Sequence, residues 1–451
     1  MPNPRHILIL IAGWLLIGPT ALGYGEYVSV NMRTQRVSAD VDGWGLTKTL
    51  TALVTKTGWQ VFIEPGTRPS RRASAKFDDA STGTALSQLL PGIKFSLTSR
   101  PNTPAQLLLY STTAARATEA VKLKTKRLKN QLVVALKRNS EKTIEEIANN
   151  LGAKVVGKIP AINAYRLEFP YDNAALLGRD ALLRDDNVAG VDFNYKVDQP
   201  RGSFGTDSTT RGLSIKPGSG PDGSRTIVAL IDTPVQPDVP HSGFLLNSIS
   251  VAQGTPPPSD APSHGTSMFQ SLLRGLDAGV GSATEANVRV LPIDIYGNSE
   301  STSTFHVANG IVSAVNEGAS IVNLSLGSTA DSQFLHSVIQ EATARGVTFI
   351  ASAGNEPTTD NVYPAAYPDV LAVTAGNRDG EIASYANRGD FVDVVGPGTT
   401  VVNYQNENYR VTGTSPASAY MAGVAAGLAT TTGANPKAIQ AGLTVEYAPG
   451  K

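Results

Sequence analysis

The second half of the chain alternates continuous apolar strands with helical stretches, and no other sequence feature restricts the fold as strongly. Six apolar runs follow one another from Thr226: TIVALID, VRVLPID, SIVNLSL, VTFIASAG, DVLAVTAG and FVDVVGPG. Stretches with helical periodicity fall near residues 265–275, 304–317, 331–345 and 415–430. Strands that are apolar along their whole length are usually covered on both faces. The pattern therefore predicts an α/β domain over residues 226–451, with a parallel sheet between helices.

Length and composition limit the chemistry that the chain can perform. With 451 residues it is long enough for two to four domains. It contains no cysteine, which excludes disulfides, thiolate zinc sites and a thiol nucleophile. Its five histidines leave few candidates for imidazole chemistry.

The first 23 residues have the pattern of a secretory signal. A short basic end precedes an apolar run over residues 7–17, and small residues follow at Ala21 and Gly23. The run is short for a membrane span, so a cleaved signal peptide is favoured over an uncleaved anchor. No later segment approaches spanning length. We expect an exported mature protein, periplasmic or extracellular, without a membrane span.

Residues 24–115 form a first small α+β module. The run LTKTLTALVTKTGW is helical, QVFIEPG reads as a strand and turn, and TALSQLLPGIKFSL reads as a helix and strand. This order resembles the short N-terminal domain of secretins and TonB-linked receptors, and the resemblance implies docking to an envelope partner. A basic linker over residues 116–130 follows.

Residues 131–200 form a second small domain with the order β-α-β-β-α-β, which is that of a ferredoxin-like fold. Its pattern, including the terminal VAGVDFNYKVDQP, resembles the inhibitor I9-like propeptide of subtilisin-type proteases. The resemblance implies a domain that assists folding of a protease and covers its cleft. Residues 201–225 are rich in Gly, Ser and Pro and read as a flexible connection.

Charge is distributed unevenly, although the formal net charge is +0. Residues 1–200 carry 26 Lys and Arg against 17 Asp and Glu, a balance of +9, so the remainder has a balance of −9. The two halves therefore either attract each other or form two independently solvated surfaces. The basic half has no stripe of interleaved aromatic residues, so nucleic acid is not an expected partner.

Three polar residues fall where an active site is expected in such a sheet, at the carboxyl ends of strands. Asp232 ends TIVALID, His264 opens a helix in SHGTSMFQSLL, and Ser415 opens another in GTSPASAYMAG. Acyl transfer by a serine needs a base for the hydroxyl proton and an anion to orient that base. Taken singly, each residue has an ordinary alternative: a turn aspartate, a loop histidine and a helix-capping serine.

Six ordered blocks resemble the subtilisin-like (S8) serine peptidases: VALIDT, SHGTS, IVNLSLGS, FIASAGNEP, YPAAYPDVLAVTAG and VTGTSPASAYMAG. The resemblance covers about residues 226–445 and implies that Asp232, His264 and Ser415 form the catalytic triad. It also implies that Asn355 supplies the side-chain donor of the oxyanion hole. It assigns substrate binding to Ser325, Leu326 and Gly327, and to Ala351, Ser352, Ala353 and Gly354. We therefore expect a secreted serine endopeptidase made as a zymogen, with proteins or peptides as substrates and its own propeptide as a partner.

Several positions depart from the family pattern without removing a proton-transfer group. Pro234 follows the triad aspartate block, Ser267 follows the histidine block, and Pro416, Ala419 and Tyr420 lie in the serine block. The reaction requires no cofactor. Structural calcium is common in the family, but no acidic cluster has a spacing that assigns ligands.

Two other functions fit parts of the sequence. The chain could be an envelope-associated binding or assembly protein with a weak or inactive protease-like domain. A lipase or esterase would favour a G-x-S-x-G motif, and the run from Gly413 to Ala417 lacks its closing glycine.

Overall fold

The computed structural model describes residues 26–100, 103–200, 203–206, 212–219, 225–256, 259–377 and 379–450, and the expected signal peptide lies outside them. The described residues form two compact units, one ending at Tyr195 and the other beginning at Lys196. Following the resemblance of the sequence to a propeptide and a subtilisin-like peptidase, we call residues 26–195 the pro-region and residues 196–450 the peptidase domain.

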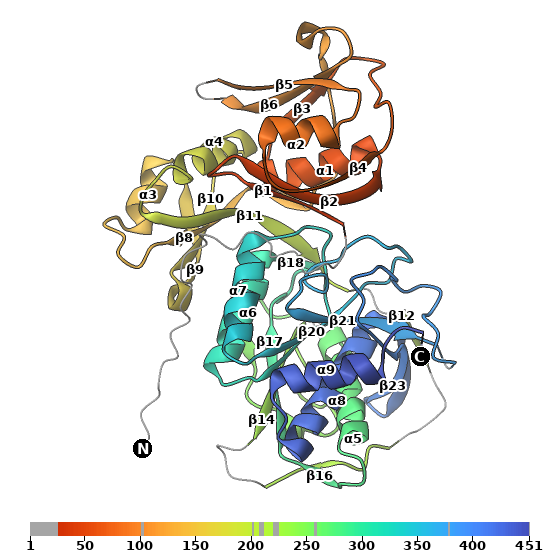
Figure 1. The fold of residues 1–451 in the computed structure, drawn as a ribbon. Helices are drawn as coiled ribbons and strands as arrows, with labels where there is room; N and C mark the ends of the chain where they lie inside the picture. The colour runs from red at the N-terminus through yellow and green to blue at the C-terminus, as the bar shows by residue number, and fades with distance from the viewer. Residues whose placement is uncertain are drawn as a thin grey trace. The chain divides into compact units, whose positions relative to one another are not determined.

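The first module of the pro-region contains two sheets and two helices (Figure 1). One sheet has the order β1-β2-β4 and the other the order β5-β6-β3-β7. The elements are β1 (Tyr27–Asn31), β2 (Arg36–Trp44), α1 (Leu46–Thr57), β3 (Gln60–Ile63), β4 (Ala73–Ser81), α2 (Thr82–Leu89), β5 (Lys94–Arg100), β6 (Thr103–Tyr110) and β7 (Glu119–Ala120). The apolar face of α1 buries Leu50 and Leu53 in a core shared with Trp44 and Trp59.

The stretch expected to be a linker, residues 116–130, contains β7 and the start of the next strand, and residues 121–126 between them have no regular secondary structure. Strand β7 pairs with β3, and the Val121 N–H donates to the Val61 carbonyl at 2.9 Å. Val121 and Leu123 pack against the core of the first module, while Lys122 and Lys124 between and beside them are exposed. The next strand begins at Arg127. Alternation of apolar and basic residues lets this segment pack on one side.

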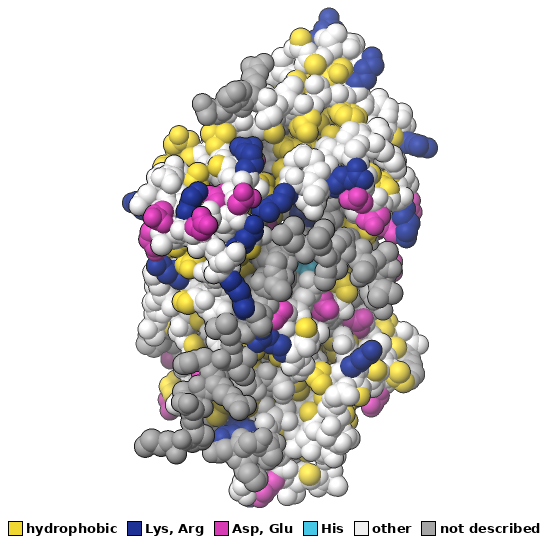
Figure 2. All heavy atoms as spheres, turned by 60° about the vertical axis from the view of Figure 1, so that its left-hand side comes forward, with side chains coloured by type: hydrophobic (Ala, Val, Ile, Leu, Met, Phe, Trp, Pro, Cys, Tyr) yellow, Lys and Arg dark blue, Asp and Glu magenta, His cyan; other side chains and the backbone are white. Residues whose placement is uncertain are grey.

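The second module has the predicted order β-α-β-β-α-β. Its elements are β8 (Arg127–Leu136), α3 (Ile144–Asn150), β9 (Lys154–Ile159), β10 (Ala164–Glu168), α4 (Asp172–Leu182) and β11 (Val188–Asp198). The strands lie in the order β11-β8-β10-β9 with antiparallel pairing. A capping box between Thr143 and Glu146 fixes the start of α3. Figure 2 shows a face on which basic and acidic side chains are interspersed. Lys142 and Asp185 form an ion pair within the second module.

A seven-stranded sheet forms the centre of the peptidase domain, in the order β15-β17-β14-β19-β20-β21-β22 and parallel throughout. The strands are β14 (Thr226–Asp232), β15 (Ile249–Ser250), β17 (Val288–Asp294), β19 (Ile321–Leu324), β20 (Thr348–Ser352), β21 (Val370–Gly376) and β22 (Val394–Pro397). All six predicted apolar runs contain one of these strands. The structure thus confirms the predicted α/β fold.

Helices cover both faces of this sheet. They are α5 (His264–Gly279), α6 (Thr304–Asn316), α7 (Gln333–Ala344), α8 (Thr414–Thr432) and α9 (Pro436–Glu446). Val228 and Leu230 of β14 share a core with residues of α5 and α8. Ile231 instead faces Gly310 of α6. Successive strand residues point to opposite faces, so α5 and α8 lie on one side and α6 on the other.

Short strands border the central sheet. They are β12 (Ser203–Thr206), β13 (Lys216–Pro217), β16 (Glu285–Ala286), β18 (Ser301–Ser303), β23 (Thr399–Tyr404) and β24 (Glu407–Thr412). Strands β23 and β24 form a hairpin, and β12 adds to its β24 edge. No helix among the described residues is long and apolar enough to cross a membrane.

Candidate active site

Asp232 lies where the chain changes direction across the central sheet. Strand β14, which it ends, has β17 on one side and β19 on the other. The chain first builds β15 and β17 on one side, and then β19 to β22 on the other. The connections that follow β14 and β17 thus run to opposite sides of β14, and its carboxyl end lies at such a switch point, where ligand sites occur in open α/β sheets.

His264 is held against Asp232 at the start of α5. Its Nδ1 lies 2.7 Å from Oδ1 and 2.9 Å from Oδ2 of Asp232, and the two side chains are 5% and 1% exposed. Asp232 also accepts a hydrogen bond from the Thr233 N–H at 2.6 Å. Because a carboxylate only accepts hydrogen bonds, Nδ1 carries the proton and Nε2 presents its lone pair. Within the described part of the chain, Nε2 is buried without a hydrogen-bond partner.

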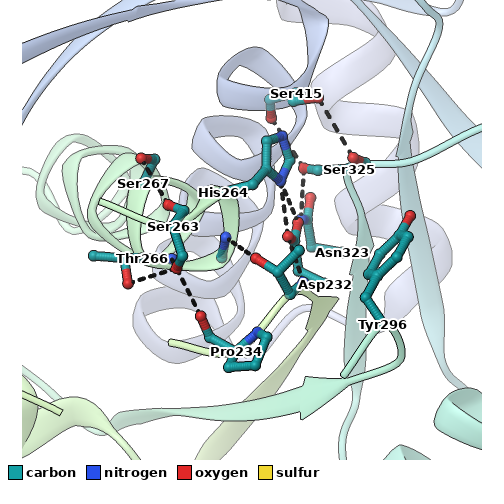
Figure 3. Close-up of polar contacts among 12 residues, drawn as sticks. Asp232, Pro234, Ser263, His264, Thr266, Ser267, Tyr296, Asn323, Ser325 and Ser415 are labelled. Carbon is teal, nitrogen blue, oxygen red and sulfur yellow. Dashed lines mark hydrogen bonds and ion pairs between the residues drawn. The ribbon is translucent and has the colours of Figure 1, made fainter. Parts of the chain in front are cut away.

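Ser415 lies beside that imidazole, at the second residue of α8 (Figure 3). The ring of His264 lies between Asp232 and Ser415. The Ser415 hydroxyl donates to the Ser325 carbonyl at 3.4 Å. Gly413 precedes the helix with φ 153°, and a methyl group there would lie 3.2 Å from the Asn355 amide nitrogen. The structure therefore brings Asp232, His264 and Ser415 together from three separate elements.

Asn355 follows the end of β20 and is oriented by Thr414, the residue before Ser415. Its Oδ1 accepts from the Thr414 N–H at 2.8 Å and from the Thr414 hydroxyl at 3.0 Å. That hydroxyl also accepts from the Gly354 N–H at 3.1 Å. Because Oδ1 takes both bonds, Nδ2 is the amide donor left for a ligand. Sequence reasoning missed this role of Thr414, which the adjacent GTS motif could have suggested.

The expected substrate-binding residues lie at the carboxyl ends of two neighbouring strands. Ser325, Leu326 and Gly327 follow β19, and Ala351 to Gly354 span the end of β20 and the turn after it. Ser328, the next residue after the first group, forms an isolated antiparallel bridge with Tyr363. A methyl group on Gly327 would lie 2.5 Å from the Val362 side chain.

A buried hydroxyl network supports the start of α8. Ser325 and Ser418 each donate to the Ser415 carbonyl at 3.0 Å, and their own hydroxyls are 2.9 Å apart. The Asn323 amide donates to the Ser325 hydroxyl at 2.9 Å. Asn323, Ser325 and Ser418 are all fully buried. Sequence reasoning placed Ser418 inside the helix but missed its link to Ser325.

Helices α5 and α8, which carry His264 and Ser415 at their N-termini, lie side by side with their backbones almost touching (Figure 1). A Cβ on Gly423 would lie 1.9 Å from the Leu272 carbonyl oxygen, and one on Gly275 would lie 1.8 Å from that of Tyr420. Gly279 and Gly427 approach similarly. We call these four glycines the glycine seam, which sets the distance between the two helices.

Near Asp232, one tyrosine has a shifted pKa. Burial, together with the charge of Asp232, raises the pKa of Tyr296 well above its usual value, so the phenol stays neutral. His306 and His336 lie on α6 and α7, where they pair with Thr302 and Asp369. Within the described ranges, no three His, Cys, Asp or Glu residues gather as a metal-binding group.

Comparisons with known proteins identify two families in the chain. The model of the subtilase family matches residues 223–444, and that of the fervidolysin N-terminal prodomain matches residues 113–194. Thermitase of Thermoactinomyces vulgaris is 31% identical over 212 residues, which cover 46% of this chain and 76% of thermitase. An alkaline protease of Alkalihalobacillus alcalophilus is 34% identical over 209 residues, covering 45% of this chain and 54% of that protein.

The structure of fervidolysin from Fervidobacterium pennivorans shares the fold, with a TM-score of 0.54 and 21% identity over 70% of this chain and 57% of that one. The chain therefore belongs to the subtilase family and is a serine endopeptidase that carries a prodomain.

Proposed function

We propose that Asp232, His264 and Ser415 carry out peptide hydrolysis in this endopeptidase, with Asn355 and the Ser415 N–H as oxyanion donors. The observation that carries the proposal is the buried Asp232–His264 pair, which leaves Nε2 of His264 unpaired beside Ser415. A base in this state can accept the serine proton, and a paired anion stabilises the imidazolium that forms.

The reaction proceeds in two halves. His264 Nε2 takes the hydroxyl proton while Ser415 Oγ bonds to the scissile carbonyl carbon. The C–N bond then breaks, and His264 returns the proton to the leaving amine. A water molecule next gives a proton to His264 and attacks the ester, which releases the acid and restores the serine hydroxyl. Asn355 Nδ2 and the N-terminus of α8 stabilise the charge on the carbonyl oxygen.

Replacement of the nucleophile tests this assignment. Ser415→Ala is expected to abolish peptide hydrolysis, self-processing and labelling by a fluorophosphonate probe. Ser337→Ala is the matched control, because it removes a helical serine hydroxyl from α7 that donates only to the Gln333 carbonyl. Persistent labelling of the Ser415→Ala chain would refute the assignment. Absence of labelling in the unmodified, folded chain would favour the inactive binding protein instead.

We also propose that the chain is a zymogen whose propeptide domain spans residues 131–200. The last residues of this domain pair with β18 of the peptidase domain as an added strand. Lys196–Asp198 pair antiparallel with Ser301–Ser303, and the Gln199 N–H donates to the Glu300 carbonyl at 2.9 Å. Val197 is buried there, 2% exposed.

Further along, Gly205 and Thr206 pair with β24, which leads directly into Ser415. The segment from Gln199 to Gly205 is therefore held at both ends. Gln199 is hydrogen-bonded to Glu300, next to β18, and Gly205 pairs with β24, the strand before Ser415. We place the maturation cleavage among the peptide bonds of this segment. Intact-mass measurement of the mature enzyme should give an N-terminus within residues 200–205. An N-terminus within residues 117–130 would contradict this placement.

Export and envelope binding complete the proposal. Residues 1–23 supply the signal peptide, so the mature protein is expected in the periplasm or the medium. The resemblance of residues 24–115 to a secretin and TonB receptor module supports an envelope partner. Cell fractionation with crosslinking tests both points, and a cytoplasmic product that retains residues 1–23 would contradict export. Structural calcium is common among subtilases, and loss of thermal stability in a chelator would reveal it.

A further inference from the structure

Three of the four last carbonyls of α1, in the first module, accept hydrogen bonds from the second module. The last four carbonyls of a helix have no partner within the helix beyond its capping residue. Gly58, with φ 72°, caps the Val54 carbonyl at 2.8 Å. The other three carbonyls accept hydrogen bonds from two side chains of the second module: Tyr195 Oη to Thr55 at 2.9 Å, Arg179 Nη2 to Lys56 at 3.0 Å, and Arg179 Nη1 to Thr57 at 3.2 Å.

The second module depends on this contact because the contact supplies hydrogen-bond partners for its buried Arg179. Its side chain is almost fully buried, with 5% of the residue exposed, and burial lowers the pKa of its guanidinium. A buried cation is costly unless negative partners compensate it. The helix C-terminus supplies such a partner through its carbonyls and its dipole. The Phe193 ring, 4.5 Å from Arg179 Cζ, adds a cation–π contact.

The packing around this cap leaves no room for a side chain at residue 58. A Cβ on Gly58 would lie 2.5 Å from Leu176 Cδ2 and 2.7 Å from Phe193 Cζ. Leu176 and Phe193 are both buried. Gly58 therefore meets two constraints at once, a left-handed backbone and direct contact with the second module. Arg33 adds a hydrogen bond across the same boundary, to the Val188 carbonyl at 3.2 Å.

We propose that the first module is a structural part of the propeptide, and that its α1 terminus is the binding surface that completes the second module. Residues 26–195 then fold as one unit. Given the proposed zymogen function, both modules leave the peptidase domain together at maturation. The primary role of the first module is thus to stabilise the propeptide, and docking to another protein is secondary.

A cut between the modules in the full chain tests the proposal. A site for a sequence-specific protease is placed at residues 124–126, in a chain that also carries Ser415→Ala to prevent self-cleavage. After complete cutting, the two pieces are expected to elute as one particle in size-exclusion chromatography at micromolar concentration. Separation of the pieces would overturn the proposal. This measurement needs no catalysis, so its failure is distinguishable from failure of the proposed function.

Two variants of the cut chain test the role of the cap itself. Arg179→Met should lower the melting temperature of the pro-region by roughly 10 °C and release the first piece. Arg184→Met removes an exposed arginine just after α4 and should change neither. Tyr195→Phe removes only one hydroxyl and keeps the fold, so it should weaken association of the pieces about tenfold. Equal association of all three variants would overturn the role of the cap.

In the chain with an intact Ser415, the same reasoning predicts the product of maturation. The released pro-region should run as one species that contains both modules, even when the engineered site has been cut. Independent release of the first module would contradict the proposal, whereas absence of any release would contradict only the zymogen function.

Discussion

The glycine seam between α5 and α8 makes a defined prediction about catalysis. In Gly423→Ala, the new methyl carbon would lie 1.9 Å from the Leu272 carbonyl oxygen and 2.6 Å from the Leu276 nitrogen. The first of these atoms must move away by about 1.1 Å to reach even a tight contact. Both are backbone atoms of α5, so relief comes only if the helices separate.

The cost can be estimated in stability and in rate. Overpacking of this kind lowers the free energy of unfolding by about 1–3 kcal/mol. Gly423→Ala should lie near the upper end, because the methyl group would meet backbone atoms rather than a side chain that can move away. The two helices carry His264 and Ser415 at their N-termini. Because a displacement of about 1 Å between reacting groups lowers a rate on the order of 100-fold, kcat should fall about that much. Strands β19 and β20, at whose ends the expected substrate-binding residues lie, are outside the seam, so KM should change little.

The assay compares Gly423→Ala with Gly442→Ala. Gly442 lies in α9, and a methyl group there would meet no atom within 4 Å. The same substitution at that position should keep full activity and gain up to about 1 kcal/mol from helix propensity. Peptide kinetics, the rate of fluorophosphonate labelling and thermal melting are measured for both variants. A Gly423→Ala enzyme with kcat within twofold of wild type and an unchanged melting temperature would refute the reasoning.

Three further predictions concern single polar groups. Asp232→Asn removes the anion that orients His264, so kcat should fall roughly 10⁴-fold with little change in KM, and a loss below tenfold in stopped-flow acylation would contradict this. Ser418→Ala should cost about 1–2 kcal/mol of stability, measured by urea unfolding, and should lower kcat rather than raise KM. Burial raises the pKa of Asp393 from 3.8 to about 6. Between about pH 4 and pH 6 this carboxyl ionises in the unfolded chain but stays protonated in the folded one. It therefore lowers the free energy of unfolding as the pH rises through this range. Asp393→Asn keeps an acceptor for the Ala372 N–H and should stabilise the protein by up to about 3 kcal/mol above pH 6 and not at all below pH 4, whereas a gain that is independent of pH would contradict the assignment.

The order of strands and helices was predictable because burial on both faces leaves a continuous apolar run for each central strand. The position of Asp232 followed from the same logic, since a polar residue that ends such a run lies at the sheet edge where site residues meet. Helix α9 was missed, although Asn435 and Pro436 form a cap and first-turn pair at its start. The β23–β24 hairpin was also missed. Its turn residues Gln405 and Asn406 both have positive φ but lack the glycine of the usual hairpin signal.

Other features of the site could not have been predicted from local pattern at all. Gly275 and Gly423 look like ordinary weak points in helices until the partner helix is in place. Arg179 reads as a surface residue of an amphipathic helix, and only the carbonyls of α1, more than one hundred residues earlier, explain its burial. The hydroxyl of Ser325 acquires its partner Ser418 through a contact between a loop and a helix. Such pairings depend on tertiary position, which the sequence does not display locally.

The strand formed by Lys196–Asp198 has a consequence for the release of the pro-region after cleavage. While the chain is intact, this segment is covalently connected to the domain that contains β18, and it pairs with the edge of that strand. Its effective concentration there is then on the order of millimolar and does not fall when the protein is diluted. A free peptide competing for the same edge would have to exceed that value. Once this connection is cut, the segment becomes an ordinary solute, and dilution into a larger volume removes it. Occupancy of this edge by the segment would therefore be independent of protein concentration before the cut and dependent on it afterwards.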